Sequence, residues 1–98
     1  MPTKRYRKDR RTCRVTFTLP AEVAAASAHL CGDFNDWSTA SHPMKPAAGG
    51  GFELVVRLDA DRSYRYRFLL DGERWENDWA ADRYEPNEFG SEDAVVDV

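Results

Sequence analysis

Hydrophobic and polar residues alternate with a period of two along much of the chain. In the segment TCRVTFTL, residues 12–19, every second side chain is apolar and the side chains between them are polar or charged. The same alternation recurs over residues 52–58 and 63–70. Successive side chains of a β-strand point to opposite faces, so each segment is predicted to be a strand with one buried face.

A further strand is predicted over residues 27–34, and a last short strand over residues 94–98. Alanine is frequent between residues 20 and 30, but the apolar positions there do not recur at helical spacing, so residues 20–25 are predicted to form a turn. Long polar loops rich in proline and glycine separate the strands. Short strands, hairpin turns and no convincing helix predict an all-β chain, an immunoglobulin-like β-sandwich of about 7–8 antiparallel strands.

Charge divides the chain into two unequal parts. The first fourteen residues have a net charge of +6, and the remaining 84 have a net charge of −9. We expect residues 1–11 to form a basic flexible arm and residues 12–98 to form the sandwich. A basic arm can indicate nucleic-acid binding, but Tyr6 is the only aromatic residue within it. Nucleic acid is therefore disfavoured as a partner against a solvated tail.

The two cysteines are predicted to be free thiols. Cys13 and Cys31 do not form a CxxC motif, which argues against a zinc or thioredoxin-type site. By the alternation, Cys13 lies on the apolar face of its strand and Cys31 lies on the polar face of another. The chain also has no apolar run long enough to cross a membrane and no signal-peptide pattern at its start. We expect a cytoplasmic protein without membrane association, metal or cofactor.

Residues suited to catalysis are scattered. His29 and His42 are isolated from each other, and most carboxylates lie in turns, where they are usually solvated. The glycines at 49–51 precede a strand, and no Lys-Ser/Thr follows them, so they do not form a phosphate-binding loop. Catalysis needs a nucleophile, a base and an orienting group close together. We therefore expect a non-enzymatic protein with no catalytic residues.

Large aromatic side chains in polar loops are the exceptional feature of the sequence. They are Trp37, Trp75, Trp79, Tyr84 and Phe89. Any one of them could cap an end of the sandwich, but several together favour a binding platform. A flat indole can stack on the C–H face of a sugar ring at about 0.5–1.5 kcal/mol per contact. Two or three such contacts predict weak binding, which suits a polymer that offers many repeated units.

Three segments resemble carbohydrate-binding module family 48. They are LCGDFNDWS (30–38), YRYRFLLDGERW (64–75) and ADRYEPNEFGSEDAVVDV (81–98), and the resemblance covers residues 12–98. The family includes the glycogen-binding domain of the AMP-activated protein kinase beta subunit and the N-terminal domains of isoamylase and glycogen branching enzyme. The chain is most similar to small stand-alone bacterial proteins described as isoamylase early-set domains. The resemblance therefore implies the early-set form of the immunoglobulin-like sandwich.

The resemblance also implies a carbohydrate site. Its residues are Trp37, Arg67, Trp75, Phe89, Ser91 and Asp93. The two tryptophans match the family's stacking residues, Arg67 matches its basic residue, and Phe89 matches the residue that packs beside the sugar. Ser91 matches the small hydroxyl residue, and Asp93 stands where the family has a sugar-binding asparagine. An ionised carboxylate accepts hydrogen bonds but cannot donate them, so one hydrogen bond of the family pattern is lost or reversed here.

The position of Trp75 depends on the length of the preceding turn. A two-residue Asp-Gly turn pairs Phe68 with Trp75 and places the indole on the core face. A three-residue turn, Asp71 to Glu73, pairs Leu69 with Trp75 and places the indole outside, beside Arg67. The three-residue turn is favoured because it assembles the site that the resemblance implies.

Together these observations predict a non-catalytic module that binds α-1,4-linked glucan, such as glycogen, starch-type polysaccharide or malto-oligosaccharide. An enzyme of glycogen metabolism, recruited in trans, is a candidate second partner. The alternative is an immunoglobulin-like protein–protein interaction or regulatory module that has kept the fold and lost sugar binding.

Overall fold

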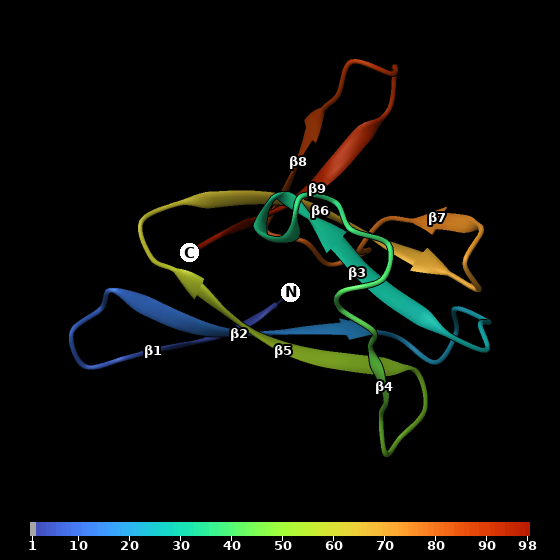
Figure 1. Cartoon of the computed structure of the whole chain (residues 1–98), viewed down its shortest axis with the longest axis horizontal. Helices are drawn as coiled ribbons and strands as arrows, with labels where there is room; N and C mark the ends of the chain where they lie inside the picture. The colour runs from blue at the N-terminus through green and yellow to red at the C-terminus, as the bar shows by residue number, and fades with distance from the viewer. Residues whose placement is uncertain (1) are drawn as a thin grey trace.

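The chain folds into two packed antiparallel β-sheets (Figure 1). A computed structural model describes residues 2–98. Sheet A has the strand order β1-β2-β5-β4; sheet B has the order β3-β6-β9-β8, and β7 also pairs with β6. The elements are β1 (Thr3–Tyr6), β2 (Thr12–Leu19), β3 (Ala28–Gly32), the 3-10 helix η1 (Asp33–Asn35), β4 (Lys45–Pro46), β5 (Phe52–Asp59), β6 (Ser63–Leu70), β7 (Arg74–Glu76), β8 (Arg83–Pro86) and β9 (Glu92–Asp97). The predicted all-β sandwich is confirmed.

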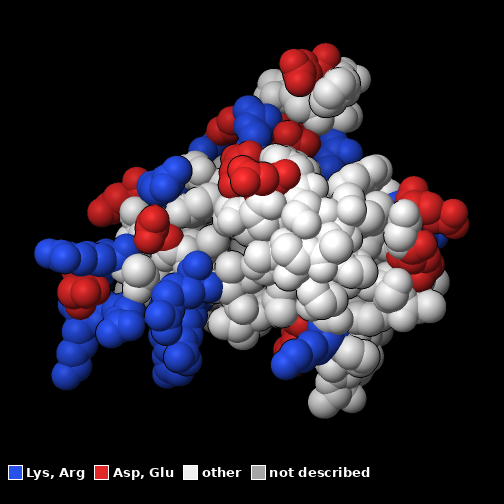
Figure 2. All heavy atoms as spheres, in the orientation of Figure 1, with Lys and Arg blue, Asp and Glu red and all other residues white. Residues whose placement is uncertain are grey.

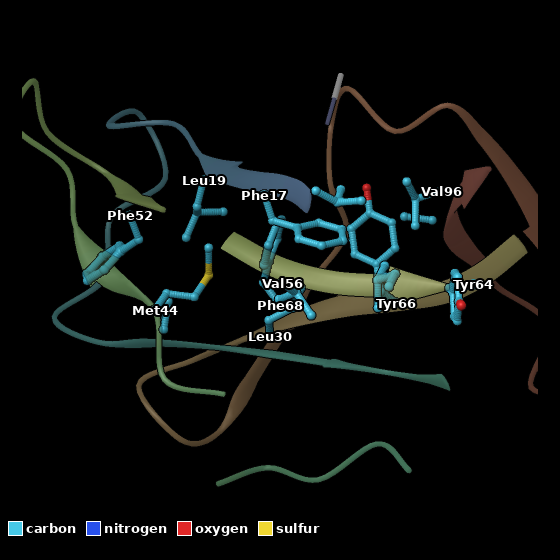
Figure 3. Close-up of a cluster of buried hydrophobic side chains, with 14 of the residues drawn as sticks. Phe17, Leu19, Leu30, Met44, Phe52, Val56, Tyr64, Tyr66, Phe68 and Val96 are labelled. Atoms are coloured by element: carbon cyan, nitrogen blue, oxygen red, sulfur yellow. The ribbon is translucent and has the colours of Figure 1, made fainter. Parts of the chain in front are cut away.

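The core lies between the sheets and consists mainly of the apolar positions of the alternating segments, with Leu30 of β3 and Met44 of the following loop packed among them (Figure 3). Strands β2 and β6 have the predicted bounds, and β5 is one residue longer than predicted. Phe17 of β2 meets Tyr66 of β6 edge-on, with ring centroids 4.9 Å apart. Edge-on aromatic pairs add to the stability gained by removing apolar area from water. The core thus joins the central strand of each sheet.

Sheet A begins earlier than the sequence suggested. Thr3–Tyr6 pairs with β2 in register, from Thr3 opposite Thr16 to Tyr6 opposite Cys13. Lys4 forms an ion pair with Asp82, with 2.6 Å between its ammonium nitrogen and the carboxylate oxygen. An edge strand with one partner and mostly exposed, charged side chains gives no alternation signal. The expected division at residue 12 therefore does not coincide with the start of the sheet.

The cysteines have the expected arrangement. Both are free and buried, Cys13 in the core and Cys31 on the other face of sheet B, opposite Arg67 in the register. Burial raises the pKa of the Cys31 thiol. A raised thiol pKa leaves little thiolate at neutral pH, so Cys31 is a packing residue rather than a reactive one. Within residues 2–98, no helix has the length and apolar character needed to cross a bilayer.

Candidate functional site

A groove of about 720 Å³ lies on the outer face of sheet B. The residues that line it are Trp37, Arg65, Arg67, Trp75, Pro86, Asn87, Glu88, Phe89, Ser91 and Asp93. All six residues of the predicted site are among them. Strand β6 pairs with β3 on one side and with β7 and β9 on the other, so segments far apart in the sequence meet across it.

Trp37 stands at the end of a tight turn that follows β3. Gly32 has no room for a side chain, because a Cβ atom there would lie 2.5 Å from the carbonyl oxygen of Arg65. The side chain of Asn35 then closes the turn, accepting a hydrogen bond from the Gly32 amide and donating one to the carbonyl of Leu30. The GDFN segment is thus needed to bring the turn close against β6.

The indole of Trp37 is held in one orientation. Its Nε1–H donates to one carboxylate oxygen of Asp33 at 3.0 Å, and the other oxygen accepts from the Arg65 amide at 2.9 Å. Both Asp36 and Trp37 have left-handed backbone angles, with φ of 55° and 58°. Such a conformation is costly for a bulky residue and persists only where the surrounding structure enforces it, often at functional sites. The half-buried indole is therefore held in a fixed orientation at the groove.

Trp75 lies on the outer face of sheet B. The turn from Asp71 to Glu73 has three residues, and the register pairs Leu69 with Trp75. The carboxylate of Asp71 accepts hydrogen bonds from the amides of Ala26 and Ser27, which fixes the turn against the preceding loop. The three-residue alternative is the one that the structure has. The indole is 45% exposed and shares the groove with Arg67.

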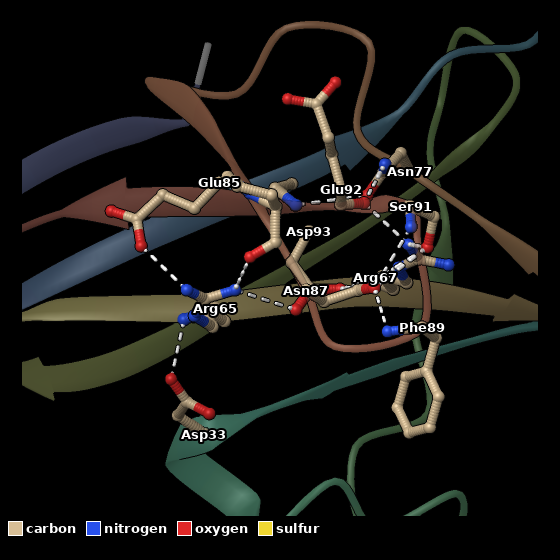
Figure 4. A network of polar contacts seen from close by, with 12 residues as sticks. Asp33, Arg65, Arg67, Asn77, Glu85, Asn87, Phe89, Ser91, Glu92 and Asp93 are labelled. Atoms are coloured by element: carbon tan, nitrogen blue, oxygen red, sulfur yellow. Dashed lines mark hydrogen bonds and ion pairs between the residues drawn. The ribbon is translucent and has the colours of Figure 1, made fainter.

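Asp93 connects the two arginines of the groove (Figure 4). One of its oxygens accepts from Arg67 Nε at 3.0 Å and from Asn87 Nδ2 at 3.1 Å, and the other accepts from Arg65 at 3.2 Å. Asp93 is only 8% exposed. Its carboxylate is thus fully engaged by donors of the protein itself. Its evident contribution is to hold the arginines in place.

The guanidinium of Arg67 is held by three hydrogen-bond partners and has one nitrogen without a partner among residues 2–98. Besides Asp93, its Nη2 donates to Ser91 Oγ at 2.9 Å and to the carbonyl of Glu92 at 2.6 Å. Its Nη1 has no hydrogen-bond partner among residues 2–98. A guanidinium held rigidly with free N–H groups is well prepared to donate to an acceptor in the groove.

Asn77 holds the end of β9 next to the groove. Strand β9 pairs with β6 up to Tyr66, and β7 pairs with β6 from Phe68 onward. Between them the side chain of Asn77 donates to the carbonyl of Glu92 at 2.8 Å and accepts from the amide of Ala94 at 3.1 Å. The side chain of Asn77 thus satisfies two backbone groups of β9 that have no backbone partner on β7.

The loop between β8 and β9 forms the outer wall of the groove. Asn87 organises it, since its side-chain oxygen accepts from the amides of Phe89 and Ser91. Phe89 is 85% exposed at the tip, and Figure 4 shows its ring pointing away from the polar network. A hydrogen-bonded turn with an exposed aromatic ring offers an apolar surface beside the groove.

Two residues that line the groove were not predicted from the sequence. Two of the aromatic residues singled out in the sequence lie outside the groove. Arg65 and Asn87 line the groove although neither was predicted as a site residue. Arg65 could have been found, because it lies two residues before Arg67 on the same strand face. Trp79 and Tyr84 do not line the groove, and the Tyr84 hydroxyl donates to the carbonyl of Asp78.

The sequence matches the family model of carbohydrate-binding module 48 (isoamylase N-terminal domain) over residues 6–85. No curated protein matches the chain. The matched range includes Trp37, Arg67 and Trp75. It ends before the β8–β9 loop, which supplies Phe89 and Ser91, and before Asp93 of β9.

Proposed function

The chain belongs to carbohydrate-binding module family 48, the isoamylase N-terminal domains, and on this premise we propose that its groove binds an α-1,4-linked glucan of the glycogen or starch type. The family is one of non-catalytic binding modules, so the chain is a carbohydrate-binding module and not an enzyme.

The observation that supports the proposal best is the placement of two indoles on either side of one arginine. Trp37 follows β3, Trp75 lies on β7, and Arg67 lies on β6 between these two strands. Each indole can stack on the C–H face of a glucose unit, and the free N–H groups of Arg67 can donate to sugar hydroxyls between the stacks. Successive units of one chain are then held at three points.

Phe89 and Ser91 complete the proposed site along the loop wall. Phe89 offers an exposed apolar ring at the rim, and Ser91 lies within 2.9 Å of Arg67, so its hydroxyl is close to the bound sugar. Asp93 acts through the arginines that it holds rather than by direct contact. Each stack contributes on the order of 0.5–1.5 kcal/mol, so we expect dissociation constants in the micromolar to millimolar range.

Retention on a glucan polymer does not need a tight single site. A polymer with many equivalent units offers repeated chances to rebind, which suits a module with this affinity. We extend the proposal to a second partner, an enzyme of glycogen metabolism bound in trans. A non-catalytic module could serve such an enzyme by holding it close to the glucan. Two buried free cysteines are typical of a reducing compartment and support a cytoplasmic location.

The experiment that tests the proposal is native affinity electrophoresis in gels with glycogen, a soluble linear α-1,4-glucan or a soluble β-1,4-glucan. We expect retardation by the two α-linked polymers and none by the β-linked one. Equal retardation by the β-linked polymer would show that the groove does not select α-glucan. No retardation in any of the three gels would contradict the proposal and favour the protein-interaction module.

A further inference from the structure

Three arginines lie side by side on the outer face of sheet A, on the opposite side of the sandwich from the groove. Arg5 of β1 is opposite Arg14 of β2, and Arg14 is opposite Arg57 of β5. Neighbouring strands are about 4.8 Å apart, so the three side chains form a row, here called the arginine row. Figure 2 shows basic side chains gathered over the end of the molecule that carries the β1–β2 hairpin.

The arginine row has no counter-ion in the part of the chain that the structure describes. Among residues 2–98, none of its three guanidinium groups forms an ion pair. Arg65 and Arg67 in the groove, by contrast, both pair with Asp93. Like charges directly opposite each other on adjacent strands destabilise a sheet. An anion bound across the row would remove this repulsion.

Acidic groups near the row are engaged elsewhere. Asp59 lies two residues from Arg57 on the same face, and its carboxylate lies 3.9 Å from the guanidinium of Arg62. Asp9, in the β1–β2 turn, accepts a hydrogen bond from the amide of Arg11. Neither carboxylate forms an ion pair with an arginine of the row.

A small hollow of about 200 Å³ lies over the row. Its lining residues are Arg5, Tyr6, Arg7, Thr12, Arg14 and Arg57. Thr12 Oγ1 is buried and has no hydrogen-bond partner among residues 2–98. An unsatisfied buried hydroxyl is uncommon and costly, so it is an additional sign that a polar group completes this place. The volume suits one small anion better than an oligosaccharide, whose sites are usually larger.

We propose that the arginine row with Arg7 and Thr12 is a binding site for a phosphate group, supplied by inorganic phosphate or by a sugar phosphate monoester. A phosphate monoester has a charge of about −1.5 to −2 at pH 7 and three terminal oxygens. Planar guanidinium groups bind phosphate oxygens with paired, charge-assisted hydrogen bonds. A row of three therefore fits a doubly charged group with several oxygens better than a single carboxylate.

The test compares thermal unfolding with and without phosphate at constant ionic strength, set with sodium chloride. The variants are Arg14→Gln and Arg57→Gln in the row, and Arg11→Gln as a control that removes one charge from the same hairpin outside the hollow. A ligand of the folded state raises the melting temperature in a saturable way, whereas the general stabilising effect of phosphate as a salt does not saturate and affects every variant alike.

We expect phosphate to raise the melting temperature of the wild type and of Arg11→Gln equally. Arg14→Gln and Arg57→Gln should bind phosphate about tenfold more weakly, since each loses charge-assisted hydrogen bonds. In the absence of phosphate they should melt no lower than the wild type, because repulsion within the row is relieved. A wild type without a saturable rise, or row variants with the same rise, would overturn the proposal.

The source of the phosphate group is read from a second series with glucose 6-phosphate and uncharged glucose. Tighter binding of glucose 6-phosphate than of inorganic phosphate identifies a sugar phosphate, and the reverse identifies free phosphate; both support the site. If the protein binds neither inorganic phosphate nor glucose 6-phosphate but binds a single-stranded oligonucleotide, the phosphate-site proposal is wrong. The outer face of sheet A would then be a binding surface for polyanions. The row variants should be retarded by glucan as strongly as the wild type. A failure of the phosphate-site proposal can therefore be distinguished from a failure of the glucan-binding proposal.

Discussion

Replacing Asp93 with asparagine tests whether this residue acts by holding the arginines of the groove. The carboxylate accepts hydrogen bonds from Arg65, Arg67 and Asn87 and is almost completely buried. Asparagine keeps one acceptor oxygen but removes the charge and introduces an N–H₂ group that would face the guanidinium donors. The variant therefore leaves two arginines close together with one counter-ion fewer.

The size of the effect follows from the contacts. Hydrogen bonds to a charged group contribute about 1.5–3 kcal/mol each, and breaking a buried ion pair costs about 3–5 kcal/mol. Both arginines are partly exposed, with side-chain exposures of 35% and 21%, and Arg65 keeps its ion pair with Glu85. Solvent screening reduces the estimate accordingly. We expect Asp93→Asn to lower the free energy of unfolding by about 2 kcal/mol.

Urea unfolding followed by tryptophan fluorescence measures this change. The matched control is Asp61→Asn, the same chemical change at an exposed position, which should stay within about 0.5 kcal/mol of the wild type. A double-mutant cycle with Arg67→Gln should give a coupling of about 1 kcal/mol between the two sites. If Asp93→Asn is as stable as the wild type, or if the coupling is zero, Asp93 does not hold the arginines.

Two further predictions concern the backbone and the pH dependence. Gly32→Ala should lower the free energy of unfolding by about 3 kcal/mol, because the added methyl group would overlap the carbonyl of Arg65, whereas Gly49→Ala, with open space around it, should change little. Hydrogen bonds from Arg83 hold the pKa of Asp97 below its usual range. This stabilisation is present above pH 3.9, the usual aspartate pKa, and is lost as the pH falls through the lower folded-state value. The stability difference between wild type and Asp97→Asn should therefore shrink from pH 5 to pH 2 in acid-unfolding titrations; a constant difference would refute the assignment.

The strands that span the core could be predicted from the sequence because burial imposes a period of two on them. Residues 12–19 and 63–70 are strands with the predicted bounds for this reason. The edge strands β1, β4, β7 and β8 are short and mostly exposed, so one partner and backbone hydrogen bonds hold them without an apolar pattern. Alternation alone therefore outlined β2, β5 and β6 and did not reveal these four short strands.

The site could be predicted in part because its motifs are local. The turn with Trp37 is specified within six residues by Gly32, Asn35 and the left-handed positions that follow. The role of Asp93 depends on Arg65 and Arg67, which lie 28 and 26 residues earlier in the chain. The resemblance to the family indicated that a carboxylate stands at this position, but only the three-dimensional arrangement shows which donors it meets.

The central claim is that Trp37 and Trp75 bind glucan, and titration calorimetry with maltoheptaose tests it most directly. Trp79→Ala is the matched control, because this indole is 58% exposed and lies outside the groove. We predict that Trp37→Ala and Trp75→Ala each weaken binding by about tenfold, which corresponds to roughly one stacking contact. Trp79→Ala should bind like the wild type. Unchanged affinity in both groove variants, or a loss in Trp79→Ala as large as theirs, would contradict the account.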